Sequence, residues 1–125
     1  MRLLLDTHLI LWWLKDDAQL TKKAKDLISN PEQIIFFSSV SIWEMSIKQA
    51  SGKLKVPDNI IDILLIEGFD ELSITSQHAA QAGSLPNHHK DPFDRMLIAQ
   101  AKQEDLTLVT HDSHIQKYDV AHLKI

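Results

Sequence analysis

Short apolar runs alternate with longer helix-like segments along the whole chain. Five of these runs are of the strand type, and they cover residues 3–5, 34–37, 71–74, 106–109 and 121–125. Strands that alternate with helices form parallel sheets covered by helices on both faces. We therefore predict an α/β fold, a three-layer sandwich with a five-stranded parallel sheet at its centre.

The polarity of the five runs predicts their order in the sheet. The first two runs are continuously apolar, as strands inside a parallel sheet are. The third and fifth runs alternate polar with apolar residues, which suits the two edges. With right-handed crossovers the order is 3-2-1-4-5, and the winding direction reverses between the first and fourth strands. Ligands of such sheets bind at the carboxyl ends of the strands beside that reversal.

Glycines are expected to end three of the helices. Gly52, Gly68 and Gly83 each follow a helix-like segment, at the position where a left-handed residue closes the last turn. No repeat, low-complexity tract or Pro/Gly-rich linker interrupts the 125 residues, a usual length for one domain. We therefore expect residues 1–125 to form a single domain.

The segment after the first strand is apolar at six consecutive positions, residues 9–14. A surface helix needs only one apolar stripe, so a helix that is apolar all round is buried on more than one side. One interpretation places it deep in the core. In the other, a face that includes Trp12 or Trp13 contacts a second chain, because tryptophan is enriched at interface hot spots.

The composition restricts the possible chemistry. The chain has no cysteine, which excludes thiol catalysis and cysteine-ligated zinc. Its net charge of -4 argues against a broad basic surface for nucleic acid, so a nucleic-acid substrate would require bound cations. The apolar runs near the N-terminus are too short for a signal peptide or a membrane span, so no membrane association is expected.

Four acids from four separate segments are expected at the carboxyl ends of the strands. Asp6 follows the first strand, Asp112 follows the fourth, and Glu44 and Asp94 lie near the starts of two helices. Each has an ordinary structural interpretation: an aspartate can cap a helix, and Ser41-x-x-Glu44 matches a capping box. Asp6 is not required as a cap, however, since the neighbouring threonine can also serve.

Convergence of these acids is difficult to explain by capping alone. Unpaired like charges in one crevice repel each other and raise each other's pKa values, and a divalent cation relieves that repulsion. Sites made only of carboxylates suit Mg²⁺ or Mn²⁺. Such ions polarise a phosphodiester and activate a bound water, so phosphodiester hydrolysis fits the four acids best.

The stretch "DPFD" contains two acids, Asp91 and Asp94, which lie three positions apart. Asp91 is interpreted as a helix N-cap, because Pro92 after it suits the first helical position. Asp94 lies one helical turn further on and has no capping role left. We therefore assign chemistry to Asp94 and a structural role to Asp91, with support of the catalytic site as the alternative for Asp91.

Basic residues and histidines offer further candidates. Lys48 follows Glu44 by four positions, the spacing of an ordinary helix ion pair, and contact with a phosphate is the alternative for Lys48 and for Arg95. Two histidine pairs, His111-x-x-His114 and His88-His89, could instead supply acid and base for RNA cleavage without a metal, or bind zinc together with Asp112. Neither pair has a strong metal-site spacing, and the polar loop around residues 88–89 is expected to be solvated.

Taken in order, "LLLDTH", "SIWEMSIK", "DPFDRMLIAQA" and "LTLVTHD" resemble motifs of the PIN-domain family, and more narrowly of the VapC-type ribonuclease toxins. The resemblance covers essentially the whole chain. It implies four acids that bind metal and carry out catalysis: Asp6, Glu44, Asp94 and Asp112. It also implies that the hydroxyl of Thr110 orients the last of these carboxylates or a water. His111 stands where many relatives have arginine.

The same resemblance implies an Mg²⁺- or Mn²⁺-dependent endoribonuclease that acts in the cytoplasm on a structured RNA. It further implies a homodimer and inhibition by an antitoxin protein encoded beside the toxin. Two other classes compete with this interpretation. A catalytically silent PIN-like binding module would leave RNA uncleaved in Mn²⁺. A phosphoacceptor signalling domain needs an acidic pair at the first strand, where Asp6 has no acidic neighbour.

Overall fold

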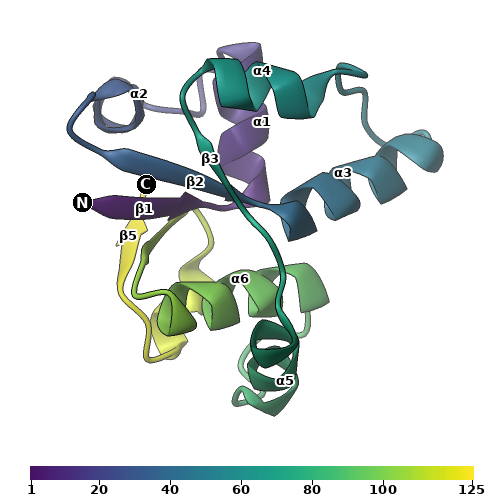
Figure 1. Ribbon diagram of the computed structural model, residues 1–125, viewed down its shortest axis with the longest axis vertical. Coiled ribbons are helices and arrows are strands. Elements are labelled where there is room, and N and C mark those ends of the chain that lie inside the picture. Colours follow the sequence, from purple (N-terminus) through teal and green to yellow (C-terminus); the bar gives the residue numbers. More distant parts are fainter.

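One five-stranded sheet lies at the centre of the computed structural model, which describes all 125 residues (Figure 1). Its strands all run parallel, in the order β3-β2-β1-β4-β5. Their bounds are β1 (Arg2–Leu5), β2 (Ile34–Ser38), β3 (Asp70–Leu72), β4 (Thr107–Thr110) and β5 (His122–Lys124). The predicted fold class, the strand order and the two edge strands are thereby confirmed.

Helices cover both faces of the sheet. Figure 1 shows α1, α2 and α4 on one side of it, and α5 and α6 on the other. The helices are α1 (Thr7–Lys15), α2 (Lys22–Ser29), α3 (Ser39–Ala50), α4 (Ile60–Ile66), α5 (Ser76–Ser84) and α6 (Pro92–Gln103), and a 3₁₀-helix, η1 (Ser113–Lys117), follows β4. No helix is long and apolar enough to cross a membrane.

The continuously apolar first strand is explained by two separate cores. Leu3 and Leu5 pack into the core formed with α1, α2 and α4, whereas Leu4 between them packs into the core formed with α6. Successive side chains of a strand point to opposite faces, so a strand covered on both sides is apolar at every position. The central strand thus holds the two helical layers together.

Two of the three glycines predicted to end helices do so. Gly52 and Gly68 follow α3 and α4 with φ of 77° and 89°, values that favour glycine. The prediction for Gly83 was wrong, because this residue lies inside α5. That helix ends instead at Leu85, whose extended backbone is favoured by Pro86 after it.

The apolar helix α1 belongs to the core. Trp12 is only 9% exposed and is part of the core shared with α2 and α4, and Trp13 is half-buried with its ring 5.8 Å from that of Phe69. The interpretation that places Trp12 at an interface was therefore wrong. The exposed tryptophan is Trp43 on α3, which retains 58% of its accessible surface.

Candidate functional site

Asp6 lies at the carboxyl end of β1, where the chain turns into α1. One carboxylate oxygen, Oδ1, accepts the backbone N–H of Leu9 (3.0 Å), so Asp6 is the N-cap of α1. Thr7, the alternative cap, instead donates its hydroxyl to Ser41 of α3 (2.9 Å). The second oxygen of Asp6, Oδ2, takes no part in the cap and is available for other contacts.

Thr110, at the end of β4, holds that second oxygen. Its hydroxyl donates to Asp6 Oδ2 (2.6 Å), and the same hydroxyl oxygen accepts the backbone N–H of Asp112 (3.0 Å). We expected Thr110 to orient the Asp112 carboxylate or a water, but the carboxylate that it orients is that of Asp6. Burial raises the pKa of Asp6, and the hydrogen bonds from Thr110 and Leu9 oppose this increase.

Asp91 and Asp94 have different positions in α6, as predicted. The Oδ1 atom of Asp91 accepts the backbone N–H groups of Phe93 (2.8 Å) and Asp94 (3.2 Å), which makes Asp91 the N-cap. Burial is the main reason that the pKa of Asp94 is raised to about 6, and the nearby charges of Asp91 and Asp6 raise it further. A hydrogen bond from His89 acts in the opposite direction.

Asp112 caps the short helix η1 and is more exposed than Asp6 or Asp94. Its Oδ1 atom accepts the backbone N–H of His114 (2.8 Å) and lies 2.8 Å from the Nδ1 atom of that histidine. Burial alone would raise its pKa, but the two bonds with His114 and the neighbouring His89 outweigh burial, so the pKa of Asp112 is lowered. Asp112 is therefore the acid most readily ionised.

Asp6, Asp94 and Asp112 line a single cavity of about 370 Å³ at the carboxyl ends of β1 and β4. The predicted location beside the winding reversal is thus confirmed for three of the four acids. The other lining residues are His8, Trp12, Gln19 and His111. Of these, only His111 was a site candidate from the sequence, as part of the alternative pair His111-x-x-His114. Trp12 contributes the apolar part of the wall, and its ring meets that of His111 edge-on at 5.2 Å.

Glu44 does not line this cavity. Its Oε2 atom lies 2.6 Å from Lys48 Nζ, the helix ion pair that the spacing predicted. The capping box predicted with Ser41 was wrong, because β2 passes directly into α3 and Ser38 is the N-cap, one turn earlier. Glu44 is buried, and its Oε1 atom has no hydrogen-bond partner.

The sequence offered His89 only through the alternative His88-His89 pair, and it was not predicted to lie among the acids. Its Nε2 atom lies 2.8 Å from Asp94 Oδ2 and 3.0 Å from Asp112 Oδ2, and the side chain is only 16% exposed. The expectation of a solvated loop was therefore wrong for this histidine. The loop is held inward by Tyr118, whose hydroxyl accepts the backbone N–H of His89 (2.8 Å). The local sequence around His89 does not indicate this contact, because Tyr118 lies 29 positions away.

Arg95 stabilises the same loop, although we had considered it as a phosphate contact. Both terminal nitrogens of its guanidinium group donate to groups of the protein itself. The acceptors are the backbone carbonyls of Ala82, Leu85, Pro86 and His89 and the hydroxyl of Tyr118. The donors that a phosphate would need are thus already engaged.

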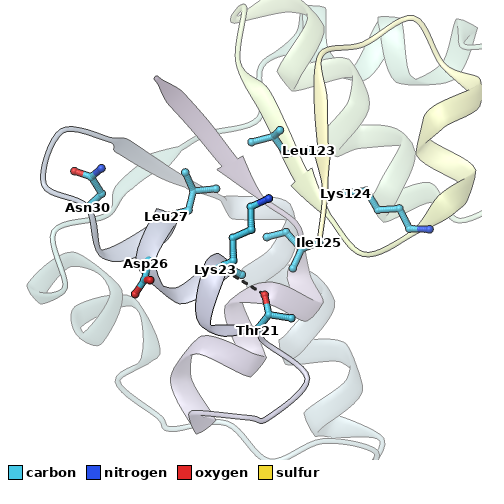
Figure 2. Close-up of a pocket in the computed structure, with 9 residues that line it drawn as sticks. Thr21, Lys23, Asp26, Leu27, Asn30, Leu123, Lys124 and Ile125 are labelled. Carbon is cyan, nitrogen blue, oxygen red and sulfur yellow. Dashed lines mark hydrogen bonds between the residues drawn. The ribbon is translucent and has the colours of Figure 1, made fainter.

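Figure 2 shows a second cavity, of about 430 Å³, between α2 and the C-terminal segment. Leu27 from α2 and Leu123 and Ile125 from the C-terminal segment contribute most of its apolar lining. Its one acid is Asp26, and it contains none of the residues predicted from the motifs. The chemistry therefore points to the acidic cavity.

The donor set of the acidic cavity fits a divalent cation. Three carboxylates lie within one small space, and burial together with their mutual repulsion makes Asp94 hard to ionise. A bound cation removes that penalty, and oxygen donors are the ligands that Mg²⁺ and Mn²⁺ prefer. Buried Glu44 offers a further oxygen donor, because its Oε1 atom has no hydrogen-bond partner.

Comparison with known proteins decides the family. The family model described as "PIN domain" matches residues 3–121. The chain belongs to the PIN domain family. This PIN domain is 26% identical over 118 residues to ribonuclease VapC22 of Mycobacterium tuberculosis, an alignment that covers 92% of this chain and 90% of the relative.

Solved structures share the fold of this PIN domain. A chain of VapBC2 from Rickettsia felis, crystallised with a DNA fragment from the promoter, matches with a TM-score of 0.74 and 16% identity over 99% of this chain and 98% of that one. VapBC-1 from nontypeable Haemophilus influenzae gives a TM-score of 0.72 and 21% identity, with the same coverage of both chains. VapBC-5 from Mycobacterium tuberculosis, described as a member of a family of toxin-antitoxin systems, gives 0.62 and 14%, with coverage of 99% and 98%.

His111 lies between the acidic cavity and the C-terminal segment. Its Nδ1 atom lies 2.6 Å from the backbone oxygen of Ile125, and its backbone N–H points to Asp6 Oδ2 (3.3 Å). The side chain therefore ties the C-terminal segment to the wall of the acidic cavity.

Proposed function

We propose that this PIN domain is an Mg²⁺- or Mn²⁺-dependent endoribonuclease that hydrolyses RNA phosphodiester bonds. The observation that carries the proposal is the gathering of Asp6, Asp94 and Asp112 in one cavity at the carboxyl ends of the central strands. Similarity to ribonuclease VapC22 supports RNA as the substrate. Glu44 remains the fourth proposed ligand, on the basis of its buried, unpartnered oxygen.

The residues of the chain prepare the site before substrate arrives. Thr110 and Leu9 fix the two oxygens of Asp6, so this carboxylate keeps one orientation and needs no ordering during the reaction. The cap made by Asp91 fixes the first turn of α6 and with it the direction of Asp94. A bound divalent ion supplies polarisation of the phosphodiester and a water of lowered pKa.

Charge explains why this nuclease would depend on a cation for binding as well as for chemistry. The cavity is acidic and the chain carries a net charge of -4, so a phosphate approaching without a counter-ion is repelled. Lys48 stays a proposed phosphate contact, since its side chain is 41% exposed next to Glu44. Arg95 is withdrawn from that role because its guanidinium bonds hold the loop.

RNA cleavage in Mg²⁺ or Mn²⁺ is expected to stop when EDTA is added, and the products are expected to carry 5′-phosphate and 3′-hydroxyl ends. These ends follow from attack by water, whereas attack by the neighbouring 2′-hydroxyl, assisted by histidines, leaves a 2′,3′-cyclic phosphate. The measurement is end-group analysis of purified fragments with and without EDTA. Cyclic-phosphate ends formed in EDTA contradict the metal mechanism, and absence of cleavage in Mn²⁺ favours a binding module.

We also propose that the protein is the toxin of a toxin–antitoxin pair, acts in the cytoplasm and forms a homodimer. The support is the similarity to VapBC chains. Exposed apolar side chains outside the acidic cavity are available to an antitoxin protein: Trp43 and Ile47 of α3 and Ile61 and Leu65 of α4 are exposed at 40–58%. Trp43 is the largest of them, and tryptophan is enriched at interface hot spots.

Trp43→Ala is expected to weaken binding of the protein encoded by the neighbouring gene by about 2 kcal/mol, or roughly 30-fold in Kd, as loss of a hot-spot tryptophan does. Folding should be preserved because Trp43 is mostly exposed. The measurement is calorimetric titration with the neighbouring gene product, with a thermal melt of the variant beside it. An unchanged Kd would show that the antitoxin contacts another face.

A further inference from the structure

The loop before α6 places an imidazole among the acids of the cavity. The Nε2 atom of His89 lies 2.8 Å from Asp94 Oδ2 and 3.0 Å from Asp112 Oδ2. One ligand atom from each of these three residues lies within 4.8 Å of the others. The nitrogen therefore occupies the space between two of the proposed metal ligands.

His89 is held there by contacts that do not involve the two acids. Its backbone N–H donates to the hydroxyl of Tyr118 (2.8 Å), and its carbonyl accepts from Arg95 (3.4 Å). The ring stacks on that of His114 with centroids 5.0 Å apart and an interplanar angle of 19°. Backbone and ring are thus both positioned in advance, as a metal ligand requires.

The spacing and the type of donor point to a metal ligand. In an octahedral shell with bonds of about 2.1 Å, neighbouring donor atoms lie roughly 3 Å apart, and the two distances from Nε2 already match that separation. Mg²⁺ takes oxygen ligands, whereas an imidazole nitrogen suits transition-metal ions. The identity of this donor therefore affects which ion the site prefers.

We propose that His89 is a ligand of the divalent metal and gives the site a preference for a transition-metal ion, represented by Mn²⁺, over Mg²⁺. This inference rests on the proposed metal-dependent function and specifies its cofactor. The competing role for His89 is that of a hydrogen-bond partner that pairs with the acids only when no metal is bound. The two roles predict opposite changes in metal affinity when the imidazole is removed. Loss of a competing partner tightens metal binding, whereas loss of a ligand weakens it.

Direct binding of ions without RNA tests the proposal. Mn²⁺ affinity is measured from the paramagnetic resonance signal of free Mn²⁺, and Mg²⁺ affinity by competition against Mn²⁺. We expect His89→Ala to raise the Mn²⁺ Kd by about tenfold or more, the scale on which loss of even a supporting residue acts, and to change the Mg²⁺ Kd far less. His88→Ala is the matched control and should leave both constants unchanged, because His88 is exposed and its ring lies against that of Tyr118.

Each other outcome has a defined meaning. Mn²⁺ binding that is unchanged or tighter in His89→Ala overturns the proposal and leaves His89 as a competing partner. If the wild type binds neither ion, the proposed metal-dependent function fails as well. His89→Gln covers the case in which the alanine variant does not fold: its amide oxygen should retain Mg²⁺ binding while Mn²⁺ selectivity is lost, and retained selectivity contradicts the proposal.

Discussion

Asp94→Asn is expected to reduce the rate of RNA cleavage by about a hundredfold or more, because a metal-bound carboxylate serves an ion that supplies several kcal/mol of transition-state stabilisation. Asparagine has nearly the same shape and keeps an oxygen, but it lacks the charge. The fold should therefore survive. The measurement is a single-turnover cleavage assay in Mn²⁺, and wild-type activity in this variant would remove Asp94 from the site.

The same substitution should stabilise the metal-free protein in a defined pH range. The pKa of Asp94 in the folded state, about 6, lies above its ordinary value of 3.8, so ionisation of this carboxyl costs stability. That cost is absent below about pH 4, grows as the pH rises and is complete above about pH 6. Asp94→Asn should therefore gain stability over wild type above pH 6 and none below pH 4, as judged by denaturant melts in EDTA.

Asp91→Ala is the matched control for Asp94→Asn. Loss of this N-cap should lower the free energy of unfolding by about 0.5–2 kcal/mol, while measurable cleavage is retained. The two aspartates lie three positions apart in the same helix start, so the pair separates a cap from a group involved in chemistry. A fully folded but inactive Asp91→Ala would place Asp91 in the catalytic site.

Trp12→Ala is expected to produce the largest loss of stability, about 3–5 kcal/mol, because it empties a large volume in a packed core. Trp12 is 9% exposed and packs in the core that α1 shares with α2 and α4. The measurement is the free energy of unfolding from denaturant melts of the isolated protein. The wild type must be compared at the same concentration, since self-association adds to apparent stability.

Trp43→Ala serves as the control for the cavity left by Trp12. The side chain of Trp43 is 58% exposed, so its removal should cost far less folding stability. Similar losses for the two variants would mean that Trp43 is covered by a partner chain in the sample. A small loss for Trp12→Ala would contradict the core assignment of α1.

The architecture was predictable from the sequence because burial of parallel strands produces a characteristic pattern of apolar residues. The runs at 3–5 and 34–37 are apolar at every position since both faces of the sheet are covered, and the third and fifth runs alternate because they lie at the edges. The end of α5 was not predictable from Gly83 alone. The conformational restriction from Pro86 outweighed the permissive glycine.

Positions of side chains were harder to predict than positions of elements. The places of Asp6, Asp94 and Asp112 follow from where strands end and helices begin, which is a property of the chain order. The inward position of His89 depends instead on Tyr118, a contact between distant segments that no periodicity encodes. The ion pair of Glu44 with Lys48 follows from their spacing, whereas the absence of Glu44 from the lining of the acidic cavity could not be read from the sequence.

The bond between Thr110 and Asp6 joins residues 104 positions apart, so the ribosome adds one half of the site 104 residues after the other. A chain still attached to the ribosome has Asp6 long before it has Asp112. Domains generally fold as whole units, and here the last two strands must be added before the acids can meet. On the proposed function, the growing chain is inactive as a nuclease until Thr110 and Asp112 have been synthesised.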